Sequence, residues 1–289
     1  MAKYYRSQAT ATRLQNEGQQ ILRTIHTHDS NYGGHFIEVT SGTGKGKTAM
    51  LLSMALYNLE HFTREKVFFS ECYNTPIQSL KLGKEKVCFF IPEKHKQTFN
   101  FRNRDKRLEE APEGFFEVVY FKDKDYEDLY NKAKLGKINV PIFADRKEIM
   151  ELIKYVNSIG EFSLILIDEM SEIATSLNSG MWHILQDWAF MCKDLRKCQN
   201  NVWYTAQNVA QIDWRIRSAV DIKIFGPGAK EDKHSRIVQG AIDNLVVDRE
   251  QGSEFYISDG GVFGLFRLND IFVPLEGLNY EINKKRKAN

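Results

Sequence analysis

The feature that most constrains the fold is a glycine-rich loop at residues 40–48, with the sequence TSGTGKGKT. An alternating run typical of a strand precedes it at 35–39, and an apolar run typical of a helix follows it at 49–62. A strand, a glycine-rich loop and a helix that begins at Lys-Thr form the context of a phosphate-binding P-loop. Glycines let backbone N–H groups turn toward phosphate oxygens, and the helix N-terminus adds positive potential. The loop therefore predicts an α/β protein that binds a nucleotide; a plain flexible turn is the alternative, which the flanking elements disfavour.

The side chains of this loop have separate expected roles. Lys47 is expected to reach the β- and γ-phosphates, and the Thr48 hydroxyl to hold Mg²⁺. The pattern G-x-x-x-x-G-K-[ST] asks for glycine where this chain has Ser41. We expect a small change in the first turn, because a serine is strained at positive φ. The candidate nucleotide-binding residues are Ser41, Gly42, Thr43, Gly44, Lys45, Gly46, Lys47 and Thr48.

A second motif is the apolar run at 162–167, which ends in Asp168 and Glu169. Such a run fits a strand buried on both faces of a parallel sheet, and ligands bind at the carboxyl ends of such strands. In a P-loop protein this is the Walker B strand: Asp168 would hold the Mg²⁺ shell and Glu169 would polarise the attacking water. An accidental acid pair at a strand end is common on its own. Together with the P-loop, the pair predicts ATP hydrolysis.

The next predicted strand, at 201–205, is followed by a polar tip. A polar side chain at this position can contact both the γ-phosphate and the attacking water. Gln207 is therefore the sensor candidate, with Thr205 and Asn208 as less favoured choices. A helix-capping turn is the alternative interpretation of the same residues.

Two arginines follow on a short predicted helix. Arg215 and Arg217 are two positions apart, so they point to different faces. One of them could pair with Asp213 or Asp221 while the other projects outward. An outward arginine would be an arginine finger for the ATP of a neighbouring subunit. A surface salt bridge is equally compatible with either arginine.

Three regions are expected along the chain: a helical arm at 1–30, an ATPase core at 31–228, and a C-terminal hairpin region with a basic tail at 229–289. Within the core, about 72–115 reads as a basic insertion. Its segment 94–107 carries six Lys or Arg residues against one Asp, which suits either nucleic acid or a solvated loop. The run 138–143 is expected to be an edge strand, because Pro141 cannot donate to a central ladder.

Composition limits the remaining possibilities. The net charge is only +2 over 289 residues, so polyanion binding has to come from local patches. The start of the chain lacks the apolar stretch of a signal peptide, and no apolar run is long enough to span a bilayer. The four cysteines form no C-x-x-C pair, which favours free thiols in a reducing compartment over a zinc site. We expect a cytoplasmic protein, in the host cytoplasm if the chain is viral, without membrane insertion.

The order of these motifs resembles the FtsK/HerA superfamily of P-loop ATPases. The resemblance rests on the run 165–169, the segment YTAQN at 204–208, and Asp213-x-Arg215-x-Arg217. This group includes viral genome-packaging ATPases, conjugation ATPases and phage assembly proteins similar to zonula occludens toxin. The resemblance covers about 32–227, and it places Gln207 at the sensor position of the family.

The resemblance implies a three-layer α/β P-loop NTPase of the additional-strand class, with a mainly parallel central sheet and a C-terminal β-hairpin. It implies ATP and Mg²⁺ as cofactors and a homo-oligomeric ring of five or six copies. The function it implies best is a motor that translocates double-stranded DNA in viral genome packaging, with capsid or portal proteins as candidate partners. A phage-assembly, secretion or conjugation ATPase remains an alternative, as does a slow nucleotide-dependent DNA-binding switch.

Overall fold

The structure is a computed structural model, and it describes residues 8–26, 34–70, 83–96, 117–143, 145–175, 181–230, 240–247, 253–259 and 263–267. Its centre is a ten-stranded sheet with the strand order β10-β9-β8-β1-β7-β6-β2-β5-β3-β4. The strands are β1 Phe36–Thr40, β2 Lys66–Ser70, β3 Val87–Pro92, β4 Glu117–Phe121, β5 Ile138–Pro141, β6 Ser163–Ile167, β7 Asn201–Ala206, β8 Ile222–Phe225, β9 Glu254–Ser258 and β10 Phe263–Arg267.

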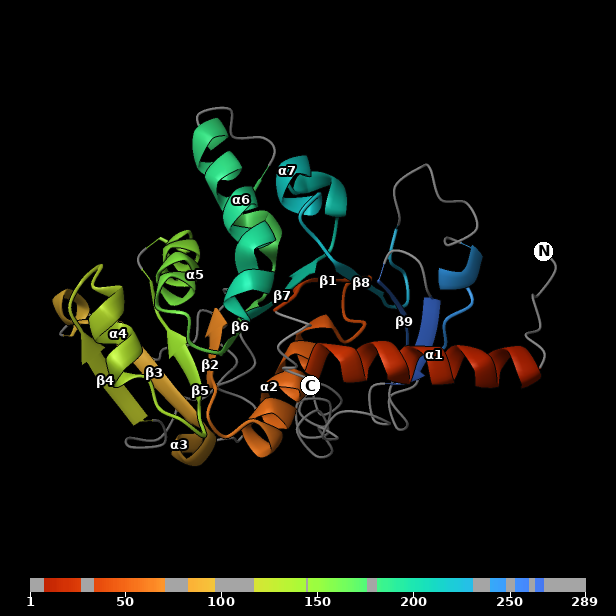
Figure 1. The fold of residues 1–289 in the computed structure, drawn as a ribbon, viewed down its shortest axis with the longest axis horizontal. Helices are drawn as coiled ribbons and strands as arrows, with labels where there is room; N and C mark the ends of the chain where they lie inside the picture. The colour runs from red at the N-terminus through yellow and green to blue at the C-terminus, as the bar shows by residue number, and fades with distance from the viewer. Residues whose placement is uncertain are drawn as a thin grey trace, which may run out of the picture.

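Helices cover both faces of this sheet, which gives three layers (Figure 1). The helices α1 and α2 lie against one face, and α4 to α7 lie against the other. Their bounds are α1 Gln8–His26, α2 Lys47–His61, α3 Gly83–Lys86, α4 Tyr126–Lys132, α5 Glu148–Ile159, α6 Trp182–Cys198 and α7 Trp214–Arg217. The predicted α/β three-layer class is therefore confirmed.

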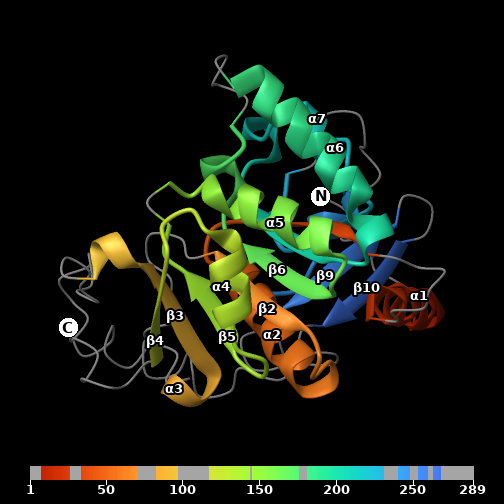
Figure 2. The ribbon, with the colours of Figure 1, turned by 60° about the vertical axis from the view of Figure 1, so that its left-hand side comes forward.

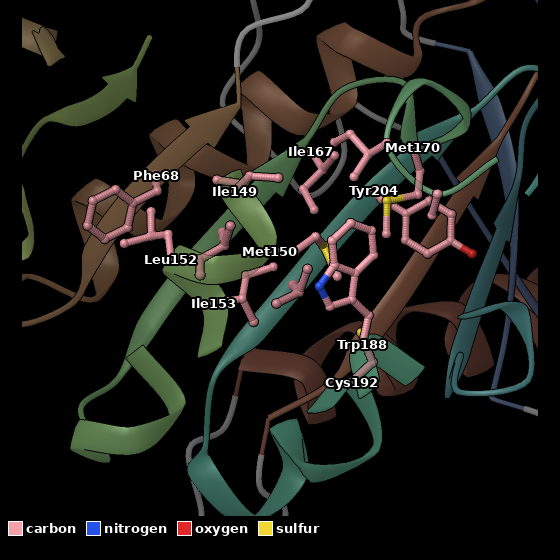
Figure 3. Packing of buried hydrophobic residues seen from close by; sticks show 14 of the residues in the cluster. Phe68, Ile149, Met150, Leu152, Ile153, Ile167, Met170, Trp188, Cys192 and Tyr204 are labelled. Atoms are coloured by element: carbon pink, nitrogen blue, oxygen red, sulfur yellow. The ribbon is translucent and has the colours of Figure 1, made fainter. Parts of the chain in front are cut away.

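The alternation of side chains along β6 explains why its sequence is apolar at four successive positions, 164–167. Leu164 and Leu166 join the cluster that contains α2, whereas Ile165 and Ile167 join the cluster with α5 and α6 on the opposite face. Figure 3 shows part of this second cluster, with Ile167 near Met170 and the α5 residues. Each fully buried aliphatic side chain stabilises the fold by about 1.5–3 kcal/mol. A strand buried on both faces therefore has a nearly continuous run of apolar residues instead of an alternation of apolar and polar ones.

The strand order places an additional strand between the two motif strands. From β8 to β4 every neighbouring pair is parallel, and β7 lies between β1 and β6. The carboxyl ends of these parallel strands therefore share one edge of the sheet. The loops that follow β1, β6, β7 and β8 meet at this edge, which is where the P-loop and the acid pair lie.

The C-terminal hairpin continues the same sheet. The strands β9 and β10 pair antiparallel with each other, as predicted, and β9 also pairs antiparallel with β8. Figure 2 shows α1 nearly end-on beside β10. The helix and the strand approach so closely that a Cβ on Gly18 would lie 2.6 Å from the Leu265 carbonyl oxygen. The boundaries of the three predicted regions remain predictions. Within the described residues, the hairpin extends the sheet of the core and α1 packs against β10.

The prediction of an edge strand at 138–143 is wrong. The strand β5 is interior, between β2 and β3. Its ladder with β2 ends at the pair Phe68–Asn139, and the Ile142 N–H donates to the Phe90 carbonyl oxygen of β3. Because successive N–H groups point to opposite sides of a strand, Pro141 faces the β2 side beyond the end of that ladder. Its missing N–H therefore costs no ladder hydrogen bond.

The predicted basic insertion contains one strand of the core. Residues 87–92 form β3, which pairs with both β5 and β4. Most of the basic segment, residues 97–107, lies outside the described residues, as does the basic tail at the C-terminus. None of the helices in the described part of the chain is long and apolar enough to cross a membrane.

Candidate active site

The glycine-rich loop connects β1 directly to α2, as the sequence predicts. Gly44 and Gly46 have φ angles of 69° and 98°, which is the left-handed region that favours glycine. Gly46 is the N-cap of α2, and as a glycine it supplies no side chain to cap the first turn of that helix. A Cβ on Gly44 would meet no atom within 4 Å, so the space beside the loop is open. An open, uncapped helix N-terminus suits the oxygens of a phosphate.

Ser41 does not show the expected strain. Among the described residues other than glycine, only Lys124, Glu169 and Gln199 have positive φ. Ser41 therefore has an ordinary backbone conformation, because the two left-handed positions of the loop are occupied by glycine. Its side chain is fully buried.

Lys47 lies back over the loop. Its Nζ donates hydrogen bonds to the Ser41 carbonyl oxygen at 2.9 Å and to the Gly42 carbonyl oxygen at 3.3 Å. The side chain is buried, and burial lowers the pKa of its ammonium below the ordinary value, while the charges of Glu169 and Asp168 act in the opposite direction. A buried ammonium that donates to loop carbonyl groups and feels the charge of two carboxylates is well placed to receive a phosphate.

A chain of three hydroxyl and carboxylate groups connects the P-loop helix to the strands beside it. The Thr48 hydroxyl donates to Asp168 Oδ2 at 2.9 Å, and the Thr205 hydroxyl donates to Asp168 Oδ1 at 2.7 Å. The Glu169 N–H in turn donates to Thr205 Oγ1 at 2.8 Å. Thr205 thus holds both acidic residues from β7. The sequence suggested Thr205 only as a less favoured sensor, and its position at the end of the strand beside β6 was the available signal.

Glu169 has an unusual backbone conformation. Its φ and ψ are 62° and 73°, in the left-handed region, which costs a non-glycine residue about 1–3 kcal/mol. Its Oε1 accepts hydrogen bonds from the Ser171 hydroxyl at 2.5 Å and from the Gln207 N–H at 3.4 Å. Such strain is concentrated at functional sites, where surrounding contacts hold it. Ser171 is not predicted from the sequence, because no pattern in it signals this contact.

Gln207 lies between the P-loop and the acid pair. Its Oε1 accepts a hydrogen bond from the Thr43 hydroxyl at 3.3 Å, while its N–H faces Glu169. Asn208, by contrast, accepts a hydrogen bond from the Ala210 N–H and caps a short 3₁₀ helix at Val209–Gln211. The structure therefore brings the sensor candidate to the site, and its role remains a prediction.

The two arginine candidates are not brought to this site. Arg215 forms a two-pronged ion pair with Asp213, with both N–O distances at 2.7 Å, and its Nη1 donates to the Trp182 carbonyl oxygen. The Nε atom of Arg217 is buried, and its charge acts on the pKa of Tyr204 and of Asp213. Pairing of one arginine with Asp213 was one of the two expected arrangements. The arginine finger remains a prediction.

The donor set fits a nucleotide with Mg²⁺. Thr48 and Asp168 present oxygens, which are the ligands that Mg²⁺ prefers. Within the described residues, no group of three or more His, Cys, Asp or Glu side chains is placed to hold a metal ion. An ion at this position would therefore take further oxygens from phosphate and water, which is usual for Mg²⁺.

Sequence comparison identifies no relative, since no family model and no curated protein sequence matches the chain. Structural comparison does. The structure is similar to the genome packaging NTPase B204 of Sulfolobus turreted icosahedral virus 2 in complex with ATP-gammaS, at 10% identity and a TM-score of 0.50, covering 81% of this chain and 97% of that one. The complex of the same NTPase with AMP matches with a TM-score of 0.50 and 10% identity, over 81% of this chain and 98% of that one. The chain has the fold of a P-loop ATPase.

A conjugation protein shows a weaker similarity to this P-loop ATPase fold. The coupling protein TcpA of pCW3 in its monomer form with ATPgS has 13% identity and a TM-score of 0.47, over 88% of this chain and 65% of that one. At 10% identity, the similarity to the packaging NTPase shows the fold alone.

Proposed function

We propose that this protein is a Mg²⁺-dependent ATP hydrolase that acts as a motor on double-stranded DNA, with viral genome packaging as its role. The observation that carries the hydrolase part is the connection from Thr48 through Asp168 and Thr205 to Glu169. It joins a phosphate-binding loop to a carboxylate at the same edge of the sheet. A protein that only bound nucleotide would not need that carboxylate.

The residues of the site have distinct roles in this proposal. The loop N–H groups and Lys47 bind the phosphates, and Lys47 exchanges its loop carbonyl partners for phosphate oxygens. Thr48 and Asp168 would hold Mg²⁺, which neutralises phosphate charge when it is bound. Glu169 accepts a proton from the attacking water, and Gln207 reports the presence of the γ-phosphate through its contacts with Thr43 and Glu169.

The DNA part of the proposal is supported by the place at which the basic segment 94–107 begins. Because β3 is parallel to its neighbours, the chain leaves it at the same edge of the sheet as the P-loop. The first residues after β3 include Lys94, which pairs with Asp123, and Lys96, which lies 5.0 Å from the centre of the Tyr120 ring. Lysines and arginines of this segment would neutralise phosphates. The similar viral protein is named a genome packaging NTPase, which points to the same role.

The deciding experiment measures ATP hydrolysis with and without double-stranded DNA, together with the mass of the assembly. We expect hydrolysis that rises with double-stranded DNA, falls with added salt, and is absent in Lys47→Ala. We also expect a ring of five or six copies in the presence of ATP. Hydrolysis that DNA leaves unchanged would favour a secretion or assembly ATPase. Turnover too slow for translocation, with tight DNA binding, would favour a nucleotide-dependent switch.

The proposed ring also makes the arginine finger testable. A Lys47→Ala subunit retains its arginines and lacks nucleotide binding, whereas an Arg217→Ala subunit binds nucleotide and lacks the finger. If Arg217 acts across the interface, mixing the two inactive variants restores part of the hydrolysis. The same mixture with Arg215→Ala tests the other candidate. No recovery in either mixture would remove both residues from this role.

A further inference from the structure

The turn that follows β8 is distant from the P-loop in sequence, but it holds the first half of that loop in space. The turn comprises Gly226, Pro227 and Gly228, directly after β8. The Pro227 carbonyl oxygen accepts the Gly42 N–H at 3.0 Å and the Ser41 hydroxyl at 3.2 Å, and the Gly226 N–H donates to the Thr40 carbonyl oxygen at 2.7 Å. Three hydrogen bonds thus fasten the start of the loop to this turn.

The turn has no room for movement toward the loop. A Cβ on Gly226 would lie 2.5 Å from Phe255 Cε1 and 2.8 Å from Ser41 Cβ. Gly228 has a φ of 75°, and a Cβ there would lie 3.4 Å from the Gly42 Cα. Glycine is therefore required at both positions, by close approach at the first and by backbone conformation at the second. The loop, the turn and β9 pack as one unit.

Phe255 supports both parts of this unit. Its ring is fully buried, and it lies against the turn at Gly226. Its Cζ would also lie 3.9 Å from a Cβ on Gly46, the N-cap of the P-loop helix. One side chain of the C-terminal hairpin thus lies close both to the turn after β8 and to the end of the glycine-rich loop at Gly46.

Ser41 has contacts on two sides. Its hydroxyl donates to the Pro227 carbonyl oxygen at 3.2 Å, with the Gly42 carbonyl oxygen as a second acceptor at 3.4 Å, and its own carbonyl oxygen accepts the hydrogen bond from Lys47 Nζ. We propose that Ser41 is a positioning residue for nucleotide binding, which acts through the Pro227 carbonyl by holding the first turn of the P-loop in its binding conformation. The proposal rests on the nucleotide binding proposed above. It assigns a purpose to the one position at which this loop departs from the P-loop pattern.

The consequence is opposite to what the motif pattern predicts. Replacing Ser41 by the glycine of the pattern should weaken nucleotide binding, because the hydrogen bond is lost and the backbone gains freedom that binding must remove. Ser41→Ala removes the hydroxyl alone and keeps the Cβ. The two substitutions therefore separate the hydrogen bond from the backbone freedom.

The test measures the dissociation constant of a fluorescent ATP analogue with Mg²⁺, at a temperature at which circular dichroism shows every variant folded. We expect the constant to rise about 3- to 10-fold in Ser41→Ala and by at least as much in Ser41→Gly. Hydrolysis at saturating ATP should change much less, since the acid pair is untouched. Ser53→Ala is the matched control, because the hydroxyl of this buried serine of α2 forms no hydrogen bond with the part of the chain that the structure describes. Its dissociation constant should equal that of the wild type.

The outcomes separate this proposal from the proposed function. If the wild type does not bind the analogue, the proposed function fails. If the wild type binds and Ser41→Gly binds as tightly or more tightly, the positioning role of Ser41 is wrong. If Ser41→Gly does not fold, Ser41→Ala takes its place: a dissociation constant equal to or below that of the wild type would show that the positioning role of Ser41 is wrong.

A second pair of variants tests the support by the hairpin. Phe255→Leu should loosen the turn and the loop. Phe266→Leu alters the ring on the neighbouring strand β10, which stacks on Phe255 with 5.7 Å between the ring centroids. Both should lower the thermal midpoint, and only Phe255→Leu should raise the dissociation constant, by about 2- to 5-fold. An equal rise in both variants would show a general loosening and would overturn support of the loop by Phe255.

Discussion

The Thr205 hydroxyl donates a 2.7 Å hydrogen bond to Asp168 and accepts the N–H of Glu169 at 2.8 Å. A single buried side chain on β7 therefore orients the carboxylate that would hold Mg²⁺ and fixes the strained backbone of the proposed base. Thr205→Val keeps the shape and removes both hydrogen bonds. We expect hydrolysis at saturating ATP to fall about 10- to 100-fold, as is typical for residues that orient a metal ligand.

Thr205→Ser is the control for this prediction, because it keeps the hydroxyl. It should retain most of the activity. A steady-state ATPase assay on both variants, with nucleotide affinity measured alongside, checks the result. Equal loss in the valine and serine variants would show that packing at this position matters and the hydroxyl does not.

Glu169→Gln tests the proposed base. The amide cannot accept the proton of the attacking water, so hydrolysis should fall by about 10²–10⁴-fold while nucleotide binding is kept. Glu172→Gln is the matched control, since this neighbouring carboxylate lies 4.0 Å from Arg146 and its side chain is half exposed. Turnover and nucleotide affinity are measured for both variants. Unchanged turnover in Glu169→Gln would remove Glu169 from this role.

The parts of the site that the sequence predicts are those encoded in local patterns. The glycine-rich loop can be recognised from Gly44, Gly46 and Lys47, because the left-handed backbone positions and the phosphate-binding charge lie within a few residues of one another. The acid pair follows from the apolar run of β6, because a strand buried on both faces has a sequence with no alternation. Both motifs then meet because parallel strands share their carboxyl edge.

Contacts between distant segments could not be predicted in the same way. Ser41 and Pro227 are 186 residues apart, and their contact depends on β8 lying beside β1. The position of β5 inside the sheet depends on where its ladder with β2 ends, so Pro141 alone could not decide it. Strand order, which sets both relationships, is a property of the whole chain.

Arg215 is expected to stabilise the fold through Asp213. The hydrogen bond from Arg215 is the main cause that lowers the pKa of the buried Asp213 carboxyl, and burial opposes it. A carboxyl with a lowered folded-state pKa contributes stability above its unfolded pKa of about 3.9, and this contribution is lost as the pH falls through the folded value. Arg215→Ala should therefore unfold at lower urea concentration than the wild type at pH 7.

The difference between Arg215→Ala and the wild type should shrink as the pH is lowered from about 4 through the lowered pKa of Asp213 in the folded wild type, because protonation of this carboxyl removes its ion pair with Arg215. Urea unfolding of both proteins at pH 7 and at acidic pH measures this difference in the free energy of unfolding. Arg215→Lys should fall between the two, because lysine keeps the charge without the two-pronged geometry. A difference that does not depend on pH would mean that lost packing against Trp182 dominates.

Gly160 ends α5 in the left-handed region, with a φ of 67°, a conformation that is common for glycine at the end of a helix. A Cβ there would meet no atom within 4 Å, so the cost of Gly160→Ala comes from the backbone alone. We expect a loss of about 1 kcal/mol in the free energy of unfolding. Gly240→Ala is the control, since the space around Gly240 is equally open and its φ is not positive. It should be neutral or stabilising in the same urea titration, because alanine restricts the unfolded chain. Equal destabilisation by both substitutions would contradict a backbone origin of the effect at Gly160.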